Sequence, residues 1–169
     1  MKAARITTVL GVGVVLLLAL LTTPATADTR SFGDRAGDVR HGMDIRKVRV
    51  RSEQRLVVTT WHRSVQAGGI AFYFDTRPSP GPEYSLVAGV GYDTDWQVFR
   101  MTNWRSVGHP VYCPSDYAFS RAADTVRASL SRTCVGGASR VRVSVRATAR
   151  GGAPDWAPGY RKFYSWVAQ

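Results

Sequence analysis

The sequence has few of the side chains from which enzyme sites are usually built. Its 169 residues include three histidines and two cysteines, and 12 acidic residues stand against 23 basic ones. It contains no G-x-S-x-G nucleophile elbow and no H-E-x-x-H helix. A dispersed triad is recognised by geometry and not by order, so that option stays open. We therefore expect a non-catalytic protein, with a secreted hydrolase as the less favoured alternative.

A carboxylate pair for glycoside hydrolysis could come only from a small set of acids. The set is Asp75, Glu83, Asp93 and Asp95. Asp93 and Asp95 also fit a polar turn, and Glu83 also fits the edge of a loop. These ordinary structural roles favour the non-catalytic reading.

Long hydrophobic runs are absent except at the N-terminus. Basic residues precede an apolar stretch at 6–21, and an A-x-A pattern ends at Ala27. This layout predicts a secretory signal peptide over 1–27, with cleavage between Ala27 and Asp28. Cleavage would remove two basic residues and lower the formal net charge from +11 to +9. We expect 28–169 to be one secreted, extracellular domain, monomeric and without a stable membrane anchor.

A sustained helical period is also absent after the leader. Val141, Val143 and Val145 alternate with polar residues in RVRVSVRA, and 45–52 alternates in a similar way. Such alternation is typical of half-buried antiparallel strands. Further strands are predicted at 55–62, 69–76, 84–90 and 96–101. About eight or nine short strands with frequent turns predict an all-β, antiparallel sandwich of the jelly-roll or DOMON-like type.

The two cysteines, Cys113 and Cys134, are expected to form one intrachain disulfide, as cysteines of secreted proteins do. A two-residue hairpin turn at 123–124 would place them opposite each other. The same register would pair Tyr117 with Leu130 on the core-facing side.

An Asp/Gly segment, DRAGDVRHGMDI, precedes the first long strand of the pattern. Asp34, Asp38 and Asp44 could offer carboxylate oxygens to calcium, and Gly37 and Gly42 would let the loop fold around an ion. The spacing is not that of an EF-hand, and another acid would have to complete the shell. The same residues also fit ordinary turns. We therefore predict that the protein requires no cofactor, and we weigh a structural calcium as an option.

Aromatic and polar residues are interleaved in YDTDWQVFRMTNWRS. Trp96 and Trp104 stand among Asp93, Asp95 and Asn103, a combination that suits the stacking and hydrogen bonding of a sugar. The alternative is that both tryptophans fill the core. A second aromatic and basic cluster at 154–166 is either a binding element or a terminal strand docked on the body.

Basic residues alternate along two predicted strands. They are Lys47, Arg49, Arg51, Arg140, Arg142 and Arg146. If the two strands shared a sheet, these side chains would form one basic plate. Arginine forks bind phosphate and carboxylate bidentately, so the plate predicts an anionic polymer as partner. Nucleic acid is not expected as the partner of an exported protein.

Three stretches carry a family resemblance. They are the Asp/Gly segment leading into DIRKVRV, FYFDT followed by a Gly/Pro loop and PEYSL, and TVRASLSRTCVGGASRVRVSVRA. Their order resembles the DOMON-like sandwiches, including carbohydrate-binding modules of family nine. It is more similar still to small secreted proteins, of unassigned function, from GC-rich Gram-positive bacteria. The resemblance implies a sandwich, and in some relatives a bound sugar, haem or a structural calcium near the Asp/Gly segment.

Together these features predict a secreted, non-catalytic binding module. Its expected ligand is a cell-surface or extracellular polysaccharide or an anionic wall polymer. The alternative is a protein that interacts with another protein as an accessory factor.

Overall fold

The computed structural model describes residues 28–91 and 94–169. The predicted signal peptide over 1–27 and Asp93 lie outside the described residues. Among the residues that the structure describes, no helix is long and apolar enough to cross a membrane.

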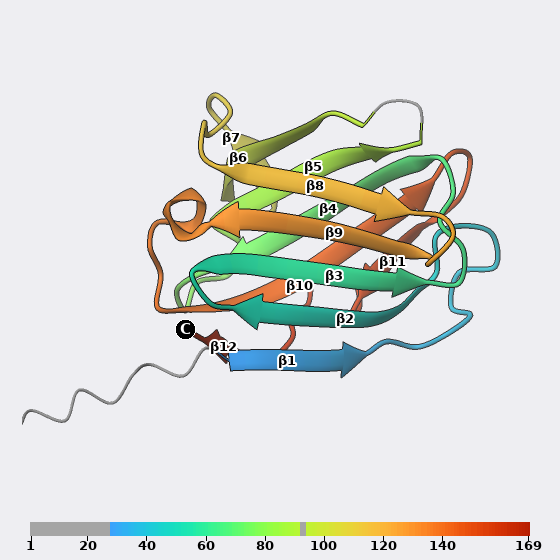
Figure 1. Cartoon of the computed structure of the whole chain (residues 1–169), viewed down its shortest axis with the longest axis horizontal. Coiled ribbons are helices and arrows are strands. Elements are labelled where there is room, and N and C mark those ends of the chain that lie inside the picture. The colour runs from blue at the N-terminus through green and yellow to red at the C-terminus, as the bar shows by residue number, and fades with distance from the viewer. Residues whose placement is uncertain (1–27, 92–93) are drawn as a thin grey trace, which may run out of the picture.

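The described chain folds into two antiparallel β-sheets packed face to face, as Figure 1 shows. The five-stranded sheet has the order β1-β2-β3-β9-β8. Its strands are β1 (Asp28–Gly33), β2 (Ile45–Ser52), β3 (Arg55–His62), β9 (Thr125–Ser131) and β8 (Ser115–Ser120). A 3-10 turn, η1 (Arg132–Val135), follows β9.

The seven-stranded sheet has the order β11-β10-β4-β5-β6-β7, and the short β12 pairs with the start of β10. Its strands are β11 (Pro154–Ala157), β10 (Arg140–Ala149), β4 (Gly68–Asp75), β5 (Tyr84–Val90), β6 (Trp96–Thr102), β7 (Arg105–Val107) and β12 (Val167–Ala168). The predicted all-β antiparallel sandwich is confirmed.

The core between the sheets follows from alternation along the strands. Val48 and Val50 of β2 face Val143 and Val145 of β10 across one interior, and Phe72 from β4 lies among them, fully buried. β2 and β10 therefore send their basic residues to the outer face of their own sheets.

The β8–β9 hairpin has a different register from the predicted one. Tyr117 pairs with Ala128, not Leu130, and the turn spans four residues, 121–124. Asp124 sets this turn, because it adopts a left-handed conformation and its carboxylate accepts a hydrogen bond from the Val65 amide. A shift of two residues keeps every side chain on its predicted face, so the core pattern did not reveal it.

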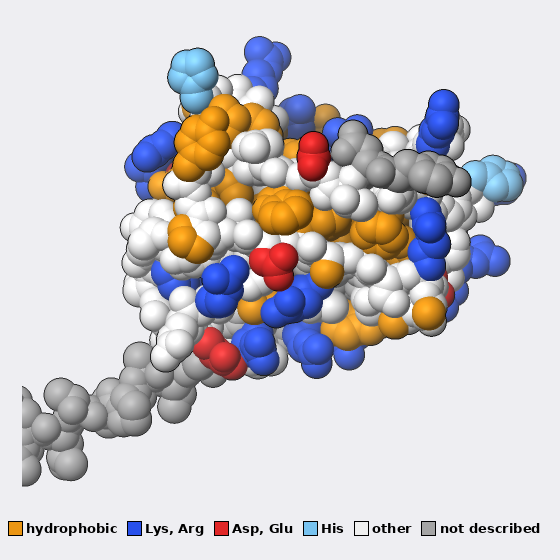
Figure 2. Space-filling model, turned by 45° about the horizontal axis from the view of Figure 1, so that its top comes forward, with side chains coloured by type: hydrophobic (Ala, Val, Ile, Leu, Met, Phe, Trp, Pro, Cys, Tyr) orange, Lys and Arg blue, Asp and Glu red, His pale blue; other side chains and the backbone are white. Residues whose placement is uncertain are grey.

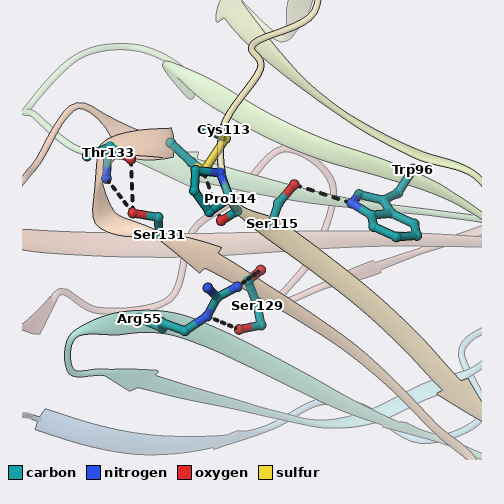
Figure 3. Close-up of a disulfide and its surroundings, with 9 residues drawn as sticks. Arg55, Trp96, Cys113, Pro114, Ser115, Ser129, Ser131 and Thr133 are labelled. Carbon is teal, nitrogen blue, oxygen red and sulfur yellow. Dashed lines mark hydrogen bonds between the residues drawn. A yellow bond between two sulfur atoms is a disulfide. The ribbon is translucent and has the colours of Figure 1, made fainter.

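The predicted disulfide is confirmed, although its cysteines lie outside the hairpin ladder. Cys113 precedes β8 and Cys134 lies in η1, with their Cα atoms 5.5 Å apart (Figure 3). The bond ties the entry to β8 to the exit from β9.

Replacing both cysteines by serine should lower the free energy of unfolding. The bond closes a loop between residues 21 positions apart, and the chain-entropy model gives about 3 kcal/mol for a loop of this order. Chemical denaturation of the variant, and of reduced wild type as its control, measures the loss. A loss below about 1 kcal/mol in both would contradict this role.

Candidate functional site

The two tryptophans of the predicted sugar site lie far apart in the fold. Trp96 begins β6 at the open edge between the sheets, where its indole N–H donates to the Ser115 hydroxyl over 3.3 Å (Figure 3). Its ring lies 6.2 Å from that of Tyr117, on the five-stranded sheet. Trp104 lies in the β6–β7 turn and packs instead against Tyr73, on the outer face of the seven-stranded sheet. The structure therefore does not bring Trp96 and Trp104 into one stacking platform.

The polar members of that predicted site are also scattered. The backbone carbonyl of Asp95 accepts a hydrogen bond from the Gly89 amide at the end of β5. Asn103 occupies the β6–β7 turn in a left-handed conformation and is exposed. Asp95 therefore lies beside Trp96 and Asn103 beside Trp104, at opposite ends of β6.

An aromatic cluster that the sequence did not predict as a unit covers part of the seven-stranded sheet. Trp156 stacks on Tyr73 with the rings 5.5 Å apart, and Phe163 stacks on Trp104 at 4.9 Å. Their source is the aromatic segment at 154–166, which docks on the sheet through β11. The docked-strand alternative for this segment is thus confirmed. Tyr73 is buried, so the cluster acts as a second small core.

The predicted basic plate is divided between two faces. β2 belongs to the five-stranded sheet and β10 to the seven-stranded sheet, so their outward side chains point in opposite directions. Lys47, Arg49 and Arg51 lie on one side of the sandwich. Arg140, Arg142 and Arg146 lie on the other. The expectation of a single plate is wrong, because sheet membership depends on pairings that alternation does not encode.

Arg142 is occupied by structural contacts. Its guanidinium forms an ion pair with the fully buried Asp75 and lies 4.9 Å from the rings of both Phe163 and Trp166. Arg140 lies over the same Trp166 ring at 4.6 Å. These contacts make both arginines part of the packing of the C-terminal segment.

The carboxylates of Asp75 and Glu83 are neighbours, but they do not form an accessible catalytic pair. Burial raises the pKa of Asp75. Burial would also raise the pKa of Glu83, but hydrogen bonds from Ser79 and Thr76 outweigh it and lower that pKa. Asp75 has no exposed surface. Glu83 lines a surface cavity of about 440 Å³, but the buried Asp75 does not reach that cavity, and both carboxylates bond to the loop at 76–82.

A groove lies on the outer face of the five-stranded sheet, with a volume of about 460 Å³. It is lined by Thr29, Arg49, Arg51, Val57, Thr59 and Arg127. We call this set the arginine groove. Figure 2 shows Lys and Arg side chains gathered on the surface that includes this sheet.

The strand register explains why arginines from separate strands meet there. Arg49 of β2 pairs with Thr59 of β3, and Thr59 pairs with Arg127 of β9. The three residues form one row across the sheet, with the threonine between the two arginines. Arg127 was not among the predicted basic residues, although TVRASLS alternates and places it on the polar side of its strand.

The guanidinium groups of this row are not neutralised by acids. Among the described residues, neither Arg49 nor Arg127 forms an ion pair, and Arg51 meets only the exposed Glu53 at 3.6 Å. An exposed pair of that kind contributes little. Arg55, beside the groove, is instead bound to the hydroxyl of Ser129 (Figure 3). Arg49 lies 5.0 Å from the Trp61 ring, which supports its side chain.

The Asp/Gly segment forms a carboxylate cluster with a different membership from the predicted one. Oxygens of Asp34, Asp38 and Asp155 lie within 4.8 Å of one another. Asp155 comes from β11, more than a hundred residues away, and also accepts a hydrogen bond from the Ile45 amide at 2.5 Å. Asp44 is not in this group; both of its oxygens accept from the Gly37 amide, at 3.0 and 3.1 Å.

The electrostatics of the cluster fit a cation. Desolvation, with repulsion from Asp155 and Asp38, raises the pKa of Asp34 to about 7. Desolvation likewise raises the pKa of Asp155 to about 6. One oxygen of Asp34 is buried without a hydrogen-bond partner. Asp34, Asp38 and Asp155 would hold a calcium ion, with further oxygens needed to complete its shell.

In comparisons with known proteins, no family model, no curated protein and no solved structure matches the chain.

The cluster predicts an unusual dependence of stability on pH when divalent cations are removed. The folded pKa of Asp34 lies above its unfolded value, so the native state binds more protons between about pH 4 and 7. The contribution of Asp34 to stability is therefore complete below that range and is lost as pH rises through it. At pH 8 in chelator, Asp34→Asn should raise the melting temperature by about 3 °C or more. Calcium should stabilise wild type and have no effect on Asp34→Asn.

The comparison must be made between variant and wild type at each pH. Burial lowers the pKa of His62 to about 4. His62 therefore lowers the stability of the protein as pH falls from about 6.5, and this effect is opposite in sign to that of the aspartates. Thermal unfolding of wild type and of Asp34→Asn, each with chelator and with calcium, gives four melting curves at each pH. Equal melting temperatures for both proteins at pH 8 in chelator, with no calcium response in wild type, would contradict the cation site.

Proposed function

We propose that the protein is a secreted, non-catalytic module that binds an anionic polymer in the arginine groove. The observation that carries the proposal is the row Arg49–Thr59–Arg127, which aligns two guanidinium groups that form no ion pair with any described residue. The polymer class that fits is phosphate-rich, such as the teichoic acids of a Gram-positive cell wall.

The chemistry of the groove supports this ligand class. Guanidinium forks match phosphate geometry bidentately and hold their charge at any physiological pH. The hydroxyls of Thr29 and Thr59 add neutral donors beside them. The net charge of +11, or +9 without the leader, would draw a polyanion to the surface before contact.

The form of the groove favours a polymer over a small molecule. It crosses four adjacent strands and is lined by side chains from β1, β2, β3 and β9. Small-molecule sites are usually concave and bury most of their ligand. A long chain can instead gain affinity by repeating weak contacts along its length.

The other functions receive less support. The separation of Trp96 from Trp104 removes the shared stacking platform on which the neutral-sugar hypothesis depended. The complete burial of Asp75 argues against the hydrolase hypothesis, which needs an accessible carboxylate pair. A protein partner would be the remaining class if no polymer bound.

Removing Arg49 and Arg127 should weaken binding of purified wall teichoic acid by tenfold or more. Each charge-assisted hydrogen bond contributes about 1.5–3 kcal/mol, and about 1.4 kcal/mol corresponds to a factor of ten. Titration of residues 28–169 at several salt concentrations measures the affinity. Wild type should show a steep fall with salt, and Arg49→Ala/Arg127→Ala a shallower one.

The matched control is Arg100→Ala/Arg105→Ala, which removes the same charge from exposed positions on β6 and β7. It should stay within about threefold of wild type, because long-range attraction alone is largely screened at physiological salt. Equal losses for the two double variants would show that net charge, and not the groove, binds the polymer.

A further inference from the structure

The seven-stranded sheet carries a second groove, which the proposed function does not use. Two adjoining hollows of about 220 and 500 Å³ lie along β10, β4 and β5 and share Gly69 and Thr148. Their other principal lining residues are Gly68, Ala71, Val87, Val90, Arg146 and Arg150. We call this set the glycine groove.

The floor of the groove is low because its strands lack side chains there. Thr148 of β10 pairs with Gly69 of β4, which pairs with Gly89 of β5. In the next row Arg146 pairs with Ala71, and Ala71 with Val87. The aromatic cluster covers the sheet from Ala71 onward, and Ala71 is itself buried, so the groove is open over Gly69, Thr148 and Val87.

The surface of the groove is apolar, with positive charge along one side. Val87 is 42% exposed, although most valines in the sandwich are buried. Arg146 and Arg150 lie four residues apart on the β10 side, with the Thr148 hydroxyl between them. Within the described ranges neither guanidinium forms an ion pair, and Arg146 lies 5.9 Å from the supporting Trp156 ring.

We propose that the glycine groove binds an acidic polysaccharide, whose sugar rings carry carboxylates. The C–H faces of the rings would lie on the glycine backbone and on Val87, while the two arginines bind carboxylates and Thr148 a ring hydroxyl. A phosphate-rich chain has fewer apolar faces and fits the arginine groove better. The site extends the proposed polymer binding to the opposite face, so one monomer can hold two different anionic chains.

The test uses residues 28–169 and tetragalacturonate, titrated by calorimetry or by NMR. Gly69→Phe should abolish binding, because the ring would fill the hollow. A Cβ at Gly69 meets its nearest atom, the Ala88 carbonyl oxygen, at 3.6 Å, so the backbone accepts a side chain there. Gly69→Ala is the matched control and should bind within about threefold of wild type. Arg146→Ala should weaken binding by tenfold or more, corresponding to one charged hydrogen bond.

Two further arms separate this site from the arginine groove. The methyl ester of the same oligosaccharide should bind at least tenfold more weakly, since it lacks the charge that the arginines recognise. Arg49→Ala/Arg127→Ala should leave unchanged the NMR shifts that tetragalacturonate induces at Gly69 and Arg146, because these residues belong to the other sheet. Unaltered binding in both Gly69→Phe and Arg146→Ala, or equal binding of the ester, would overturn the inference. If only teichoic acid bound, the inference would fail and the proposed function would stand.

Discussion

The structure depends on one constraint: a strand in a two-layered sandwich can turn only one of its two sides to the core. In β2 and β10 the inward side is valine and the outward side is largely arginine. Because these strands belong to different sheets, the constraint that builds the core also divides the charge between two opposite surfaces. Two separate basic faces follow from this division.

The two faces differ because the C-terminal segment covers only one of them. Trp156 and Phe163 pack on Tyr73 and Trp104 over part of the seven-stranded sheet, and the Asp75–Arg142 ion pair lies beneath this cover. A buried pair of this kind is costly to break once it has formed. The uncovered strip beside it has glycine where other strands have side chains, and it becomes a groove. Within 28–91 and 94–169 no segment covers the outer face of the five-stranded sheet, and Arg49 and Arg51 are exposed there.

Local features of the fold were predictable from the sequence, and non-local pairings were not. Alternation placed the long strands and the inward valines correctly, and the disulfide expected for an exported protein is present. The predicted hairpin register was wrong by two residues. Asp124 adopts a left-handed backbone conformation in the turn, and its carboxylate accepts a hydrogen bond from the distant Val65 amide. Such a shift leaves the inside–outside pattern unchanged, so periodicity cannot detect it.

The candidate sites show the same limit. Asp34 and Asp38 were identified from their own segment, but their partner Asp155 reaches them only through the β10–β11 pairing. Arg127 joins Arg49 only through β3. Conversely, Trp96 and Trp104 are close in sequence, yet they lie at opposite ends of β6 and contact different sheets.

We propose the arginine groove as the surface that binds an anionic polymer. Amide chemical-shift mapping tests it most directly, with isotope-labelled residues 28–169 titrated with teichoic acid at physiological salt. We expect the largest amide shifts on β2, β3 and β9, around Arg49, Thr59 and Arg127. Shifts concentrated at the edge between β6 and β8, or spread evenly over both sheets, would contradict it.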